Sequence, residues 1–303
     1  DLQCVDRRGA PGCRCPDRRL TMSGNLATLD QLAEDVRQQD PDRFYAMLLA
    51  PARLRDPLLV LYALNLEIAR TREQVSEPML GQIRLQWWRD QLDGVYAGEP
   101  ARHPVTEALS GVVSEFPIAR EDILCLINGR ERDLDDTPPE TTAELLQYCR
   151  DTSSGLMSMA LQVLGMDRRA AQVASEAAGI AFALAGLIRA VPFHGAQGRV
   201  MLPRDLLASN GLDVAARDHH RDPAALQGVV RDLAGIAEDQ LILARKQRRI
   251  PRKMIAGLLP ATLSGLYLRR LRAAGYDLSD ARLDPSSQVR IFNLLRARLL
   301  GRI

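Results

Sequence analysis

The sequence predicts an all-α protein built as a single-domain helical bundle, and three observations support this fold class. Apolar residues recur at spacings of three and four along ten segments, which is the period of amphipathic helices. No segment alternates apolar and polar residues for long enough to require a strand. With 303 residues, 46% of them hydrophobic, and no Gly/Ser-rich linker or repeat, the chain can bury one large core.

The first 21 residues are expected to lie outside this bundle. They hold three of the five cysteines and five arginines, and they contain no apolar run and no helical period. They also lack the apolar core of a secretory signal, so export is not indicated. We expect residues 1–21 to be disordered or extraneous and residues 22–303 to form one domain. An Arg-rich targeting sequence is the alternative interpretation of residues 1–21.

The predicted helices follow in order at 26–36, 57–69, 79–96, 105–116, 123–134, 143–164, 170–190, 224–244, 255–271 and 289–299. The breaks between them have chemical causes. Ser76 can cap the helix that opens with Glu77-Pro78, because its hydroxyl can accept from a free N–H of the first turn. Thr137-Pro138-Pro139 ends an acidic helix, and the glycines at 195 and 198 permit a turn.

Composition excludes several functional classes. The chain has 40 Lys+Arg against 38 Asp+Glu, a balance that does not indicate nucleic acid as a partner. No Cys/His cluster has zinc-ligand spacing, so neither a structural metal nor a disulfide framework is expected, and a reducing compartment fits best. The longest uncharged stretches, 152–166 and 254–268, are shorter than the roughly 20 apolar residues of a membrane span. We therefore expect a cytoplasmic protein, soluble or peripheral on the inner face of the inner membrane.

Residues 177–206, AAGIAFALAGLIRAVPFHGAQGRVMLPRDL, resemble the second aspartate-rich segment of the squalene/phytoene synthase family, QLxNILRDVxEDxxxGRxYLPxDxL. Further pieces of the family frame recur in order: Leu85-Gln86-Trp87-Trp88, Phe116-Pro117-Ile118, Ile127-Asn128-Gly129 with Asp133-Leu134, and Glu144-Leu145 to Tyr148-Cys149-Arg150. The resemblance covers residues 40–280 and implies a class I isoprenoid synthase fold. For active members it also implies head-to-head joining of two prenyl diphosphates, with magnesium held by carboxylates.

The acids of that metal site are missing here. Where the family usually reads YAFCRxxDDIxDE, the residues aligned with its acidic motif are Ala69, Arg70, Thr71, Arg72 and Glu73. In the second segment the usual acids, Gln and Asn are replaced by Ala190, His194, Ala183 and Gly186. Since Glu73 alone cannot hold a magnesium cluster, we expect no cofactor, no metal ligand and no catalytic residue.

A narrower resemblance is to the complex I (NADH dehydrogenase) assembly factor 6 proteins and their bacterial relatives. It is carried by VSEPMLGQIRLQWWRD at 75–90, ERDLDD at 131–136 and LIRAVPFHGAQGRVMLP at 187–203. This branch keeps the synthase fold without the aspartate motifs. It implies a non-catalytic protein whose partners are complex I subunits or assembly intermediates. Two alternatives stay open: a magnesium-dependent prenyltransferase, and a protein that binds a prenyl lipid or quinone without turnover.

Four arginines are candidates for binding an anion such as a diphosphate or a lipid head group: Arg70, Arg72, Arg189 and Arg199. The alternative is that they pair with nearby acids, namely Glu67, Glu73 and Asp205. His194 stands at a predicted helix end, where a lone histidine is more often a cap or a core group than a ligand. A cavity packed shut by Phe182 and Leu184 would leave only the surface for function.

A basic run is the candidate membrane-binding segment. Its cations are Arg245, Lys246, Arg248, Arg249, Arg252 and Lys253. An anionic lipid surface would attract them, whereas the simpler interpretation is a solvated helix terminus. No aromatic residues are interleaved with these cations, so nucleic acid is again disfavoured. Two acid pairs at helical spacing, Glu131 with Asp135 and Asp90 with Asp93, are assigned to solvated helix faces rather than to a metal site.

Overall fold

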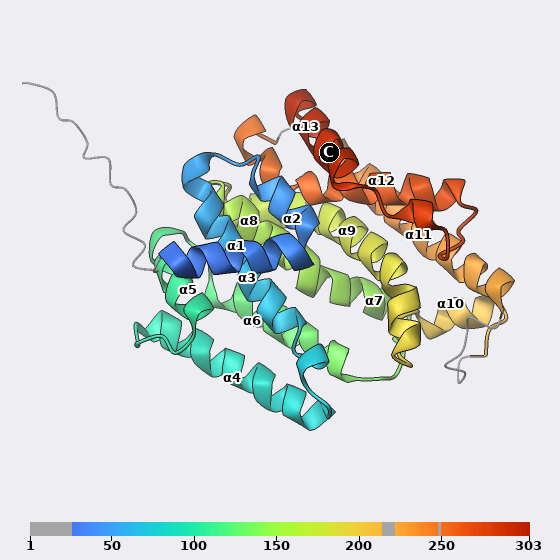
Figure 1. Cartoon of the computed structure of the whole chain (residues 1–303), viewed down its shortest axis with the longest axis horizontal. Coiled ribbons are helices and arrows are strands. Elements are labelled where there is room, and N and C mark those ends of the chain that lie inside the picture. The colour runs from blue at the N-terminus through green and yellow to red at the C-terminus, as the bar shows by residue number, and fades with distance from the viewer. Residues whose placement is uncertain (1–25, 214–221, 248–249) are drawn as a thin grey trace, which may run out of the picture.

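The computed structural model describes residues 26–213, 222–247 and 250–303, and within them it contains helices and no strand (Figure 1). The α-helices are α1 Leu26–Gln39, α2 Pro41–Met47, α3 Arg55–Ala69, α4 Pro78–Ala97, α5 Pro104–Glu115, α6 Arg120–Gly129, α7 Thr142–Cys149, α8 Gly155–Val163, α9 Arg168–Ala196, α10 Arg204–Ser209, α11 Pro223–Lys246, α12 Leu259–Ala273 and α13 Ser287–Leu300. Shorter turns are η1 Ala52–Leu54, η2 Arg72–Gln74, η3 Arg130–Leu134, η4 Arg150–Ser154, η6 Arg252–Gly257 and η7 Ala281–Leu283. The all-α prediction is confirmed; the prediction for residues 1–21 lies outside the described residues.

All ten predicted helical segments are present, with differences at their ends. The helix expected at 123–134 is α6 followed by the 3-10 turn η3, and the one expected at 143–164 is α7 and α8 joined by the π-helical turn η4. The helix expected at 255–271 begins as η6 and restarts at α12, whose second residue, Pro260, suits a first turn. Two short helices, α2 and α10, were not predicted because six or seven residues show too little periodicity.

Two boundary predictions are corrected by the structure. Glu77, not Ser76, is the residue that precedes α4, and no side-chain hydrogen bond caps that end. Pro78 at the first position removes one of the N–H groups that a cap would satisfy. The helix predicted to end at residue 190 continues through Pro192 to Ala196, and Gly198, with φ +68°, then makes the expected turn.

α9 is the central helix of the bundle. It packs against α8, α11, α12 and η4, and Figure 1 shows it running through the middle of the molecule. Among the described residues it is also the helix whose length and composition would suit a membrane span, but 61% of its apolar window is buried inside the bundle. A buried core helix has the same composition, so the burial identifies α9 as the core helix here.

The apolar core has two parts. The larger cluster joins α3, α4, α5, α6, α8 and α12, and Trp88 is its largest fully buried side chain. The smaller cluster lies between the second half of α9, α7, α10 and α11, and it includes Leu184 and Ile188. α9 contributes its first half to the larger cluster and its second half to the smaller one, so the end of α9 with residues 190–194 lies beside the smaller cluster.

Candidate functional site

The first of the two segments in which the family's acids are replaced, residues 69–73, lies at the end of α3 and in η2. Ala69 and Arg70 are half-buried, whereas Glu73, the single remaining acid, is exposed. Arg72 donates from Nη2 to Asp136 Oδ1 at 3.1 Å. The side chain of Arg70 has no hydrogen bond or ion pair with a described residue.

The second segment occupies the last turns of α9. Ala190 and His194 are half-buried, and the imidazole Nδ1 of His194 has no hydrogen-bond partner among the described residues. Burial, and then the charge of Arg199, lower the pKa of His194, so its imidazole is neutral at neutral pH. Arg199 donates from Nη2 to the carbonyl oxygen of Asp133 at 2.9 Å, while its Nε has no hydrogen-bond partner in the described part of the chain.

These residues do not fit a magnesium cluster. Magnesium requires several oxygen ligands in near-octahedral geometry, whereas the two segments offer alanines, arginines, a histidine and one exposed glutamate. In the described part of the chain, no three His, Cys, Asp or Glu side chains come together in a way that could hold a metal ion. The acid pairs noted above are engaged elsewhere, for example Glu131 with Arg89 and Asp135 with Arg132.

Arg189, the arginine shared with the family, has a carboxylate from its own chain as a partner. Its Nη1 lies 3.9 Å from Oδ2 of Asp42 on α2, and its guanidinium stacks 3.9 Å from the ring centroid of Tyr267. The Tyr267 hydroxyl donates to both Asp42 oxygens, at 2.9 and 2.8 Å. Arg290 Nε approaches Asp42 Oδ1 at 3.5 Å, and Asp284 pairs with both arginines from outside. Asp42 therefore occupies the position between Arg189, Arg290 and Tyr267 that an added anion would need.

Asp42 is almost fully buried, with 6% of its surface exposed. Burial raises the pKa of its carboxyl, although the hydrogen bond from Tyr267 and the charges of Arg290 and Arg189 act in the opposite direction. Burial also raises the pKa of Tyr267, which keeps its hydroxyl protonated as the donor. The sequence offered no signal for this group, because an acid in the first turn of a helix is ordinarily a partner of the helix dipole.

The four candidate arginines do not converge on one site, and two of the three acids expected to pair with them have other partners. Glu67 pairs with Arg84 at 3.7 Å, and Asp205 accepts from the backbone N–H of Thr142 at 2.7 Å. Arg72 and Arg199 both bind the segment 133–136, whereas Arg189 lies in the separate Asp42 group. Residues 133–136 therefore link η2, which follows α3, to the segment after α9. These are the two regions that would face each other across a metal cluster.

A second buried polar group was also missed from the sequence. Arg130 donates to Asp133 Oδ2 at 3.1 Å, to the Tyr148 hydroxyl at 2.8 Å and to Asn65 Oδ1 at 3.4 Å. Tyr148 in turn donates to Asp133 Oδ1 at 2.8 Å. This group ties α3, η3 and α7 together. The oxygen atoms of Asp133, Tyr148 and Asn65 are all hydrogen-bonded within it, whereas Arg130 Nε has no partner among the described residues.

An apolar pocket of about 510 Å³ opens beside the end of α9. Its walls come from α9, the 199–202 segment, the start of α11 and the turn 276–279: Val191, Pro192, His194, Gly195, Ala196, Arg199, Val200, Met201, Leu202, Pro223, Leu226, Gln227, Tyr276, Asp277, Leu278 and Ser279. Two of the candidate site residues, His194 and Arg199, therefore share one pocket. The residues expected to close a cavity behave differently: Leu184 is fully buried, and Phe182 is half-buried under the guanidinium of Arg43 at 4.8 Å.

The basic run is on the surface where it is described. Arg245, Lys246, Arg252 and Lys253 are exposed, whereas Arg248 and Arg249 lie outside the described residues.

Comparison with known proteins agrees with both resemblances. Residues 36–290 match the family described as squalene/phytoene synthase. The complex I assembly factor 6 of Bos taurus is 30% identical over 249 residues, which is 81% of this chain and 74% of that protein. A phytoene synthase of Rhodobacter capsulatus is 27% identical over 181 residues, 60% of this chain and 53% of that one.

Solved structures agree on the fold. A dehydrosqualene synthase crystallised with a ligand superimposes with a TM-score of 0.78 at 21% sequence identity, covering 91% of this chain and 96% of the other. Since the match at 36–290 spans most of the sequence and the structure has the same helical fold, the chain belongs to the squalene/phytoene synthase family.

Proposed function

We propose that this protein is a non-catalytic member of its family that acts in the assembly of respiratory complex I, with complex I subunits or assembly intermediates as partners. The observation that carries the proposal is the replacement of the metal-binding acids at Ala69 and Ala190 together with the presence of Asp42 beside Arg189. A diphosphate leaving group needs charge neutralisation by bound metal ions, and these residues offer no binding position for such ions. The similarity to complex I assembly factor 6 supports the specific role.

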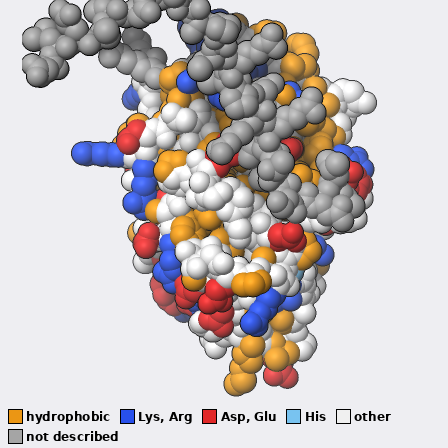
Figure 2. All heavy atoms as spheres, turned by 90° about the vertical axis from the view of Figure 1, so that its left-hand side faces the viewer, with side chains coloured by type: hydrophobic (Ala, Val, Ile, Leu, Met, Phe, Trp, Pro, Cys, Tyr) orange, Lys and Arg blue, Asp and Glu red, His pale blue; other side chains and the backbone are white. Residues whose placement is uncertain are grey.

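A surface suited to a protein partner lies at the start of α4. Met79, Leu80 and Ile83 are exposed by 68%, 46% and 60%, and Figure 2 shows hydrophobic side chains gathered at the lower end of the molecule, where α4 begins in Figure 1. Glu73 and Glu77 are exposed beside them in sequence, which suits a partner with an apolar centre and a basic rim. This α4 tip belongs to the segment 75–90 that resembles assembly factor 6.

The assembly role is tested in a strain that lacks the gene. We expect loss of assembled complex I, measured as NADH:quinone activity and as complex abundance on native gels. Wild type should restore it, whereas Ile83→Asp should restore it several-fold less because a charge in an apolar contact is costly. Restoration by Ile83→Asp at the wild-type level would remove the α4 tip as the contact surface, and unaltered complex I in the deletion strain would overturn the role itself.

The alternative of a magnesium-dependent prenyltransferase is tested directly. We expect no release of inorganic diphosphate from farnesyl or geranylgeranyl diphosphate with magnesium, under conditions in which an active family synthase turns over. Turnover that is lost in Glu73→Gln would instead establish catalysis in which Glu73 acts together with metal ligands outside the two segments.

A second function, binding of a prenyl lipid, is favoured by the pocket at the end of α9. Pockets of this size lined by apolar side chains with a few polar groups are typical of small-molecule sites. Arg199 has no carboxylate partner among the described residues, and its free Nε together with the neutral His194 suits a lipid with an anionic head. This binding is compatible with the assembly role.

We expect farnesyl phosphate to bind this pocket and Arg199→Gln to weaken the binding by about tenfold, since a hydrogen bond to a charged group contributes about 1.5–3 kcal/mol. Titration calorimetry measures the dissociation constant. The matched control is Arg204→Gln, because Arg204 follows closely in sequence but does not line the pocket. Equal affinities in the two variants would contradict a head-group role for Arg199.

A further inference from the structure

α13 carries an apolar stripe that no other described part of the chain covers. The helix packs on α2, α12 and η6 through Leu294 and Ala297, which are buried. On its outer side five apolar side chains are exposed: Ile291 by 38%, Phe292 by 66%, Leu295 by 42%, Leu299 by 76% and Leu300 by 58%. Four of them, Ile291, Phe292, Leu295 and Leu299, are linked by spacings of three and four residues, which places these four along one side of the helix. In Figure 1 this helix lies at the end of the molecule opposite α4.

The surroundings of the stripe are basic. α13 carries Arg296 and Arg298 outside the Asp42 group and contains no acid, and Arg302 follows it after Gly301. η6 packs against α13 and brings Arg252 and Lys253, both exposed, to the same edge. Arg252 lies over Gly301, since a Cβ there would be 3.4 Å from its Nε. The acid just before the helix, Asp284, is already paired with Arg189 and Arg290.

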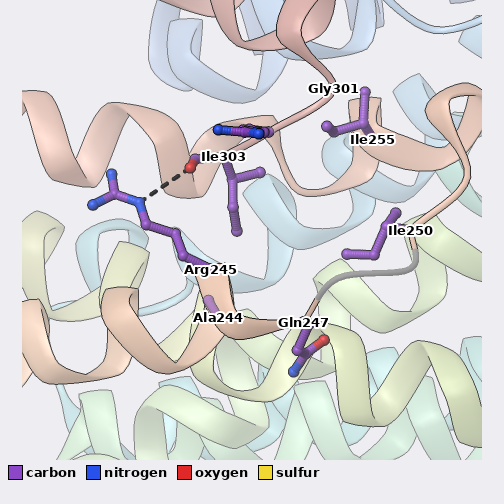
Figure 3. A pocket seen from close by; sticks show the side chains of 8 residues that line it. Ala244, Arg245, Gln247, Ile250, Ile255, Gly301 and Ile303 are labelled. Carbon is purple, nitrogen blue, oxygen red and sulfur yellow. Dashed lines mark hydrogen bonds between the residues drawn. The ribbon is translucent and has the colours of Figure 1, made fainter.

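A hollow of about 670 Å³ adjoins this edge and lies between the end of α11 and the residues that follow α13 (Figure 3). Arg245 donates from Nε to the carbonyl oxygen of Ile303 at 3.0 Å. Ile250, Ile255 and Ile303 line the hollow, with Arg245 and Arg302 beside them. Burial, and then the neighbouring Arg269, lower the pKa of Arg245, so an anion in the hollow would offset an unfavourable charge. The basic run and the last helix, distant in sequence, therefore form one surface.

We propose that this surface, the α13 face (Ile291, Phe292, Leu295, Leu299, Arg252 and Lys253), docks the protein on an anionic lipid bilayer. The apolar stripe would enter the boundary between head groups and acyl chains, while the surrounding cations bind lipid phosphates. Charge decides between the possible occupants. A second copy of the chain would bring basic rim against basic rim, which is repulsive, whereas an anionic membrane complements both the stripe and the rim. The inference stands independently of the assembly role.

Vesicle co-sedimentation of the full chain tests the proposal. We expect binding to vesicles of phosphatidylcholine with phosphatidylglycerol, weak binding to phosphatidylcholine alone, and loss of binding as salt screens the charges. Phe292→Asp and Leu299→Asp should each weaken binding by at least about tenfold, because each removes a large apolar side chain from the bilayer boundary. Arg252→Gln and Lys253→Gln should each weaken it by about fivefold.

Matched controls come from exposed residues outside the α13 face. Ile83→Asp makes the same chemical change at another exposed apolar residue, and Arg102→Gln removes an exposed arginine from the loop before α5; both should bind vesicles like wild type. All these side chains are exposed, so circular dichroism should report an unchanged fold. Equal binding to neutral and anionic vesicles would overturn the proposal, as would Leu299→Asp binding like Ile83→Asp. A concentration-dependent dimer that Leu299→Asp abolishes, without vesicle binding, would assign the face to a second copy instead.

Discussion

Replacing Asp42 with alanine is expected to lower the free energy of unfolding by about 3 kcal/mol, because removing one partner of a buried ion pair leaves the other charge uncompensated. Arg290 has 14% of its side chain exposed and Arg189 has 31%, so both would lose their interior carboxylate while remaining largely shielded from water. Tyr267 would lose the acceptor of both of its hydrogen bonds. Denaturant unfolding followed by circular dichroism measures the change.

The control for this substitution is Asp284→Ala. Asp284 contacts the same two arginines, but 70% of its side chain is exposed, so its loss should cost less than about 1 kcal/mol. If the two substitutions proved equally costly, burial of Asp42 would not be the source of its contribution.

The Asp42→Ala variant also tests whether Asp42 occupies an anion-binding position. Inorganic diphosphate should raise the thermal unfolding midpoint of the variant more than that of wild type, because a ligand that binds only the folded state stabilises it. Identical shifts in both proteins would mean that Arg189 and Arg290 only form structural ion pairs with the chain's own carboxylates and do not bind an added anion. The result bears on the proposed function, since an anion-binding position that the protein's own Asp42 carboxylate occupies is unsuited to a diphosphate substrate.

Much of the fold could be predicted from the sequence, because helix periodicity is a local signal. The ten predicted segments all lie in helices. The family motifs from Leu85 to Asp205 indicate the family from the sequence alone. The errors occur where local signals compete. α9 continues past residue 190 because its helical hydrogen bonds and its packing on α11 outweigh the cost of Pro192, which the sequence alone favours as a stop. The break between η6 and α12 was missed because the apolar pattern is continuous across it.

The site was predicted only in part. The replacement of the family's acids at 69–73 and 190–194 can be read directly from the sequence, because it depends on residue identity and not on geometry. The partners of the arginines are not: Asp42 is 147 positions before Arg189, and only the tertiary fold brings α2 against α9 and α12. The α13 face was missed for a similar reason. The basic run was recognised as a segment, but its proximity to an exposed apolar stripe about 45 residues later depends on how η6 packs on α13.

The close approach of η4 to α9 predicts the second large effect, at Gly179. A Cβ built there would clash with Cα of Ser154 and lie 2.6 Å from its backbone N, so the backbone itself would have to move. Two hydroxyl groups hold the helices at this distance: Ser153 donates to the carbonyl of Gly179 at 2.9 Å, and Ser154 donates to that of Glu176 at 2.8 Å. Gly179→Ala should therefore destabilise the fold by about 3 kcal/mol, the upper range for overpacking a core.

Gly186 provides a control on the same helix. It is exposed, and a Cβ there would meet nothing within 4 Å, so Gly186→Ala should instead stabilise the helix by up to about 1 kcal/mol. Opposite signs for the two alanine variants in denaturant unfolding would establish that close packing, not glycine flexibility, is required at Gly179; equal signs would contradict it. Because α9 carries Arg189 to Asp42 and His194 to the pocket, Gly179→Ala should also reduce the affinity for farnesyl phosphate, whereas Gly186→Ala should leave it unchanged.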